Sequence, residues 1–160
     1  MKKEKKKSAQ TARSIIYIIL IVVLIGGLAY LGFRSKENGA MQGMVTLENG
    51  LQYEITKEGS GPGIKSGEVA VVNYTGRLED GTVFDSNVDP AFGHTVVFEF
   101  VIDEGAVIKG WDIGVKGMKV GEKRTLVLPP ELGYGSSSIG LIPPNATLIF
   151  DVELLEIKQD

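Results

Sequence analysis

The sequence predicts an α+β domain made mostly of β-strands with one short helix, preceded by a single transmembrane helix. Three observations carry this prediction. Residues 15–33 form an uncharged apolar run. After residue 46, short segments rich in Val, Ile, Leu, Phe and Tyr alternate with glycine-containing turns, as strands do. Within residues 107–115, apolar residues recur at spacings of three and four, which is typical of a helix.

The run from Ile15 to Phe33 predicts an uncleaved signal anchor. Its 19 residues would make about 28 Å of helix, close to the ~30 Å bilayer core. The tail, residues 1–14, carries six basic side chains and one acidic one, so the positive-inside rule places it in the cytoplasm and the rest of the chain outside. A cleaved signal peptide is the main alternative, although its apolar region usually has only about 7 to 15 residues. A buried core helix would need a much larger protein around it.

Residues 34–46 show no sustained period and are expected to be a linker, which leaves residues 47–160 as the folded domain. An Asp-Gly turn at residues 79–81 predicts a hairpin. The strands are expected at Leu51–Lys57, Val69–Leu78, Thr82–Asp85, Val96–Val101, Arg124–Leu128 and Ala146–Ile157. In the last strand, period-two alternation predicts one buried face, made of Leu148, Phe150, Val152 and Leu154. The helix, Val107–Val115, must then lie against the sheet.

Composition excludes several classes of function. The chain has no cysteine, and therefore no disulfide, thiolate metal site or cysteine nucleophile. Its net charge of −3 gives no indication of nucleic-acid binding. No phosphate-binding glycine motif is present. His94 is the only histidine, and we expect it to be a solvated loop side chain, so hydrolase and transferase chemistry lacks its usual groups.

Aromatic side chains are concentrated beside turn signals. They are Tyr74, Phe84, Phe98, Phe100, Trp111, Tyr134 and Phe150, and Asp85 directly follows Phe84. Composition alone would make them ordinary core residues, but the order of the motifs around them favours a site. The motifs are Val72-Asn73-Tyr74-Thr75-Gly76, Leu78 to Ser86, Val107-Ile108-Lys109-Gly110-Trp111, Gly121-Glu122, Leu132-Gly133-Tyr134-Gly135, and Ile142 to Leu155.

In this order the motifs closely resemble the FKBP-type peptidyl-prolyl cis-trans isomerases, over about residues 47–157. The resemblance implies a curved antiparallel β-sheet wrapped around the short helix, with an apolar pocket between them that admits a proline ring. It implies catalytic positions at Asp85 and Tyr134. The substrate-binding positions that it implies are Tyr74, Phe84, Phe98, Val107, Ile108, Trp111, Ile142 and Phe150.

The chain departs from the family pattern in two loops. Residues 87–95 form a longer segment than in short members, so the basic residue that often pairs with the pocket acid has no assigned position. The loop from Tyr134 to Pro143 is slightly shorter and lacks the histidine that some members carry there. We expect the serine run within it, residues 136–138, to be a flexible loop.

The resemblance implies catalysed rotation about X-Pro bonds in proline-containing polypeptides. The predicted membrane topology makes exported polypeptides the expected clients. The resemblance implies no metal or organic cofactor, and macrolide inhibitors of the rapamycin class as further ligands. The alternative function is a membrane-tethered chaperone or client-binding module that uses the pocket without significant catalysis. Tyr134 and Pro143 are only nine positions apart, which leaves no room for a chaperone insertion, and the linker is too short for dimerisation helices.

Overall fold

The computed structural model describes residues 43–159. The predicted basic tail (1–14), the signal anchor (15–33) and most of the linker (34–46) therefore lie outside the described residues. Within residues 43–159, no helix has the length and apolar character needed to span a bilayer.

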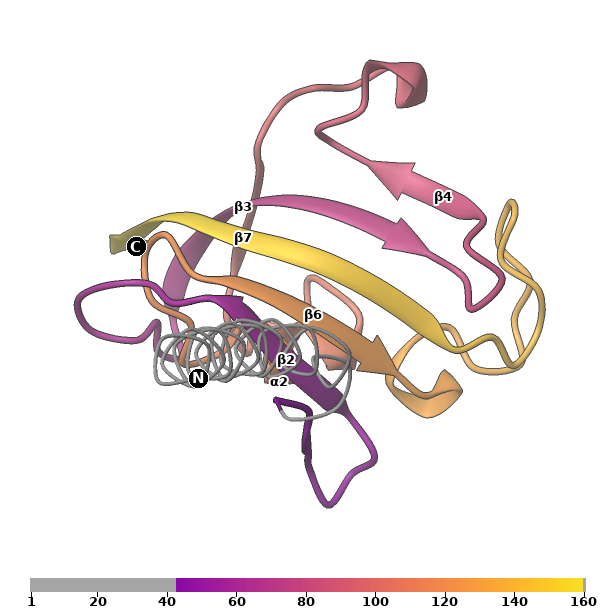
Figure 1. The fold of residues 1–160 in the computed structure, drawn as a ribbon, viewed down its shortest axis with the longest axis horizontal. Coiled ribbons are helices and arrows are strands. Elements are labelled where there is room, and N and C mark those ends of the chain that lie inside the picture. The colour runs from indigo at the N-terminus through magenta and orange to yellow at the C-terminus, as the bar shows by residue number, and fades with distance from the viewer. Residues whose placement is uncertain (1–42, 160) are drawn as a thin grey trace, which may run out of the picture. The chain divides into compact units, whose positions relative to one another are not determined.

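The described strands form one antiparallel sheet in the order β1-β2-β6-β7-β3-β4, with β5 paired to the first half of β3. The longest strands, β3 and β7, run side by side through its centre and curve along their length (Figure 1). The strands are β1 (Val45–Thr46), β2 (Gln52–Lys57), β3 (Glu68–Arg77), β4 (Val83–Ser86), β5 (Phe98–Val101), β6 (Lys123–Leu128) and β7 (Leu148–Gln159).

The six predicted strands are confirmed as β2 to β7, with ends shifted by one or two residues. The predicted hairpin between β3 and β4 is also confirmed: the Leu78 amide donates to the Thr82 carbonyl at 2.9 Å, and Gly81 has the positive φ of 87° that such a turn requires. Strand β1 was not predicted. It lies in the range expected to be linker and pairs with β2, Val45 opposite Tyr53, and it is too short to show alternation.

Helix α2 (Lys109–Val115) starts two residues later than predicted, because Ile108 keeps an extended backbone at φ −60° and ψ 146°. Its glycines bring the helix backbone close to the sheet. A Cβ on Gly110 would lie 2.0 Å from Leu128 Cδ2, and one on Gly114 would lie 2.7 Å from Leu126 Cδ1. Two short 3₁₀ turns, η1 (Pro90–Phe92) and η2 (Pro130–Leu132), were not predicted.

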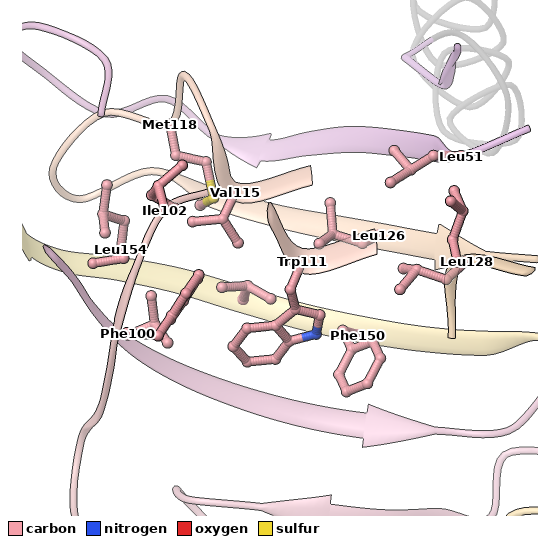
Figure 2. Packing of buried hydrophobic residues seen from close by; sticks show 14 of the residues in the cluster. Leu51, Phe100, Ile102, Trp111, Val115, Met118, Leu126, Leu128, Phe150 and Leu154 are labelled. Carbon is pink, nitrogen blue, oxygen red and sulfur yellow. The ribbon is translucent and has the colours of Figure 1, made fainter. Parts of the chain in front are cut away.

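The core lies between α2 and the concave side of the sheet, and includes Trp111 and Val115 from the helix and Leu126 and Leu128 from β6 (Figure 2). The predicted alternation of β7 is confirmed. Its buried residues are Leu148, Phe150, Val152 and Leu154, and Asp151 between them is exposed. The sheet and helix thereby hold Trp111 and Phe150 against each other.

Candidate active site

A cavity of about 620 Å³ opens beside α2. All ten predicted site residues line it: Tyr74, Phe84, Asp85, Phe98, Val107, Ile108, Trp111, Tyr134, Ile142 and Phe150. Sequence reasoning missed four further lining residues, which are Ala106, Ile139, Gly140 and Leu141. The structure therefore brings the predicted residues together, from four strands, one helix and the loops next to them.

The floor of the cavity is the indole of Trp111, whose residue surface is only 4% exposed. Three rings meet it edge to face: Tyr74 at 5.1 Å between ring centroids, Phe98 at 5.7 Å and Phe150 at 5.3 Å. The indole nitrogen points towards Phe150 (Figure 2), and within the described residues it has no hydrogen-bond partner. The base of the cavity is thus a buried surface of closely packed aromatic rings.

Gly76 of β3 makes room for two of the pocket walls. A Cβ at this position would lie 2.6 Å from Phe84 Cε2 and 2.8 Å from Phe150 Cε1. Both distances are shorter than real carbon contacts, so only glycine lets the two rings pack directly against the strand.

A β-bulge turns Phe84 and Asp85 into the same cavity. Neighbouring strand residues normally point to opposite faces, and the sequence therefore required a local distortion here. In the pairing of β3 with β4, Gly76 lies opposite Asp85 but Arg77 lies opposite Val83, which leaves Phe84 as the extra residue. The distortion that the sequence requires is confirmed.

Two side chains hold the Asp85 carboxylate at the edge of the cavity. The Tyr74 hydroxyl donates to Oδ2 at 2.6 Å, and His94 Nε2 lies 3.0 Å from Oδ1. Burial and the hydrogen bond to Asp85 raise the pKa of Tyr74 above its ordinary value, so this hydroxyl stays a donor at neutral pH. His94 is an exposed loop side chain, as expected, but the loop also folds it back onto Asp85, nine positions earlier.

The loop between η2 and β7 forms the rim. Ile139 and Ile142 exchange two backbone hydrogen bonds, at 2.8 and 3.0 Å, around Gly140 with its φ of 55°. This turn brings Ile139 and Leu141 to the cavity, although sequence reasoning treated the preceding serine run only as a flexible loop. The apolar pair on either side of a glycine was the available signal.

A curved sheet around a short helix, with one carboxylate at the edge of an aromatic cavity, matches a known class of proteins. Residues 61–155 match the family model of the FKBP-type peptidyl-prolyl cis-trans isomerases. The chain belongs to this family and is a peptidyl-prolyl cis-trans isomerase. Proteins of this family bind proline-containing substrates and macrolides.

Individual relatives agree with the family match. The chain is 41% identical to FK506-binding protein 2 of Yarrowia lipolytica, over 93% of this chain and 95% of that protein. It is similar to the crystal structure of FkpA from Escherichia coli, with a TM-score of 0.66 and 34% identity over 99% of this chain and 74% of that one. It is 47% identical to FK506-binding protein 4 of Neurospora crassa over 76% of its own length, but spans only 25% of that protein.

Proposed function

We propose that this protein catalyses X-Pro rotation in exported polypeptides by holding the proline ring in the aromatic cavity above Trp111. The observation that carries the proposal is the cavity itself: three rings packed edge to face on the Trp111 floor, with a single carboxylate at the edge. A proline ring is a compact apolar group, and a cavity of this composition suits it.

The chemistry needs no nucleophile. Rotation must break amide resonance against a barrier of roughly 18 to 20 kcal/mol, and in the twisted state the nitrogen regains its lone pair while the amide dipole falls. A cleft that removes water from the planar amide therefore favours the twisted form relative to the planar one. The closed aromatic floor of Trp111, Phe150 and Phe84 is the part of this site that excludes water.

Three polar groups act on the client backbone. The Ile108 amide precedes the first helical turn and has no acceptor within the helix, so it donates to a client carbonyl. The Tyr134 hydroxyl, on the exposed rim, donates to a second one. The Asp85 carboxylate faces the client carbonyl that turns during rotation. The oxygen of that carbonyl is most negative in the planar amide, so the nearby carboxylate disfavours the planar form more than the twisted one.

The rim predicts which clients are preferred. Ile139 and Leu141 are apolar and exposed next to the cavity, whereas Asp85 would repel an acidic side chain. A peptide with Leu before proline should turn over faster than one with Glu in that position. Equal turnover of both peptides would contradict this model of the cavity.

A client-binding module without significant catalysis is the second candidate. It is favoured by the exposed apolar side chains around the cavity, notably Ile139 and Leu141, which could hold an unfolded segment. The two candidates differ in one readout: a holding module slows client aggregation but leaves the X-Pro exchange rate unchanged.

We also propose that residues 15–33 anchor the chain in a membrane, with residues 1–14 in the cytoplasm and the isomerase domain outside it. The support is the uncharged run and the basic tail before it. Protease added to intact cells should digest the domain, and a protected domain would contradict this orientation. A mature chain that begins after residue 33 would contradict the anchor but not the export.

The direct test of the activity measures cis-trans exchange by NMR on a capped peptide containing Leu-Pro, with the full chain in mild detergent. Catalysed exchange is expected, unchanged by EDTA and inhibited by a rapamycin-class macrolide. Exchange at the uncatalysed rate, or activity that EDTA removes and a divalent ion restores, would overturn the proposal.

A further inference from the structure

The loop between β4 and β5, residues 87–97, is tied down at its base. Asn87 is 3% exposed, and its side-chain amide donates to the carbonyls of Val72 and Val96, each at 3.1 Å. The same side chain accepts a hydrogen bond from the Tyr74 amide at 2.8 Å. One buried residue thus joins both ends of the loop to β3, so the loop leaves and returns at a fixed place.

The middle of the loop is also specified. Asp89 caps η1 by accepting the Ala91 amide at 2.9 Å. The Gly93 amide closes the turn on the Pro90 carbonyl at 3.0 Å, with a positive φ of 78°. His94 follows immediately and ends with Nε2 at 3.0 Å from Asp85 Oδ1. The loop therefore brings one side chain to the edge of the cavity.

We propose that His94 is a positioning residue of the isomerase: it holds the Asp85 carboxylate against Tyr74 and, by gaining or losing its own proton, sets the net charge at the cavity edge. The inference rests on the role proposed above for Asp85. It makes catalysis by this chain dependent on pH through a single histidine.

The hydrogen bond persists in both states of the imidazole, and only the charge changes. A carboxylate can only accept, so Nε2 carries the proton whether the ring is neutral or cationic. Histidine is the side chain that changes charge between about pH 5 and 8. When His94 is cationic it compensates the charge of Asp85, the carboxylate acts less on the turning carbonyl, and kcat falls. KM for an uncharged peptide stays constant, because neither state blocks the cavity.

The other titratable groups around this pair are two tyrosines and an aspartate, which are residue types that ordinarily titrate outside that range. Tyr74 from β3 and Tyr134 from the loop before β7 face the carboxylate, and Asp89 lies on the same loop as His94. Tyrosine and aspartate ordinarily titrate near pH 10 and pH 4, respectively. Among the residue types at the cavity edge, histidine is the one whose ordinary titration range lies between these limits.

The experiment measures kcat and KM for a capped Leu-Pro peptide without ionisable groups, by NMR exchange with the full chain in detergent, from about pH 5.5 to 8. Wild-type kcat is expected to rise about two- to fivefold with pH, the range for an exposed charge pair. Its midpoint should equal that of the imidazole proton resonance, which is unambiguous because the chain has one histidine.

Three variants separate the roles. His94→Gln keeps a neutral donor and should stay at the high-pH kcat throughout, whereas His94→Arg keeps the charge and should stay at the low-pH value. Asp89→Asn is the matched control: it removes a charge from the same loop but still caps η1, so the pH step should remain. Urea midpoints should be unchanged in both His94 variants, because this side chain is 47% exposed.

Two results would overturn the role of His94 and leave the proposed function standing. One is a pH step in kcat that survives in His94→Gln. The other is a wild-type kcat that does not change with pH, although Asp85→Asn has lost rate. Uncatalysed exchange at every pH would overturn the proposed function instead.

Discussion

Two carboxylates of this domain each have two neighbours, yet they occupy opposite environments. Glu122 has a side chain 2% exposed; its Oε1 accepts from Arg124 Nη2 at 2.6 Å and Nε at 3.0 Å, and its Oε2 accepts the Lys119 amide at 3.0 Å. Asp85 has a side chain 40% exposed and is held by Tyr74 and His94 at the cavity edge. The first is closed to water and to ligands, and the second is open to both.

The difference in solvent exposure determines whether each carboxylate contributes to stability or to the reaction. Arg124 also donates to the Gly114 carbonyl at 2.7 Å and stacks on Tyr53, so the buried pair joins the end of α2 to β6. Loss of one partner of the buried pair would leave the other as an unpaired charge that water cannot reach, and the free energy of unfolding would fall. At the cavity edge, water can replace a lost partner, so the rate of catalysed exchange falls while stability changes little.

The largest effect is expected at Trp111, which belongs both to the hydrophobic core and to the cavity. Trp111→Ala should open a cavity in the core and destabilise the domain by about 3 to 5 kcal/mol, and it should also abolish catalysis. Urea unfolding and peptide exchange measure the two effects. Leu141→Ala, on the exposed rim, is the control, with a stability change within about 0.5 kcal/mol; equal losses in both variants would contradict the assignment of the floor.

The buried pair should be costly to break but irrelevant to the reaction. Glu122→Gln should cost about 3 to 5 kcal/mol, because Arg124 would keep a buried, unpaired charge. The matched control is Glu153→Gln, whose partner Lys123 is exposed, with an expected cost of about 0 to 1 kcal/mol. Similar urea midpoints for the two variants would remove the contrast between the buried and the open carboxylate.

A smaller effect, on rate alone, is expected at the rim. Tyr134→Phe removes one hydroxyl that would donate to the client, and kcat/KM should fall by roughly five- to tenfold, the value of about one hydrogen bond. The urea midpoint should not move, because Tyr134 contributes little to the core. If the variant unfolds more easily without losing rate, its place in the site is wrong.

The smallest effect is a pH dependence of stability at the cavity edge. Burial and Asp85 raise the pKa of Tyr74 in the folded state, so the folded chain holds this proton after the unfolded chain has lost it. The contribution of the Tyr74 proton to the free energy of unfolding is therefore complete below about pH 10, the ordinary tyrosine pKa. It is lost as pH rises above that value. Urea midpoints above pH 10 should fall more steeply for wild type than for Tyr74→Phe.

Local patterns were sufficient to predict most of the fold. The alternation in β7 and the helical spacing around Trp111 arise because one face of each element is buried, so these patterns predict the buried residues. The short strand β1 has too few residues for any period, and only its pairing with β2 defines it. The sheet therefore begins at Val45, six residues before the first predicted strand at Leu51.

The sequence motifs predicted the site residues on strands, on the helix and at turns. They did not predict the residues that two loops bring to the site. The ten predicted residues lie on strands, on the helix or beside recognisable turns. His94 and Ile139 reach the cavity only because Asn87 and the turn at Gly140 fold two loops back. Such contacts depend on the geometry of the whole domain, and the apolar pair on either side of Gly140 was the only local signal for one of them.

The central claim is that the open carboxylate serves the reaction while the buried one serves the fold. Its most direct test is to measure kcat/KM for a Leu-Pro peptide and the urea midpoint on the same preparations of Asp85→Asn and Glu122→Gln. We predict that Asp85→Asn loses about tenfold or more in rate with a stability change of at most about 1 kcal/mol, and that Glu122→Gln loses stability but retains the rate wherever it is folded. An Asp85→Asn variant with wild-type rate, or one as unstable as Glu122→Gln, would contradict the claim.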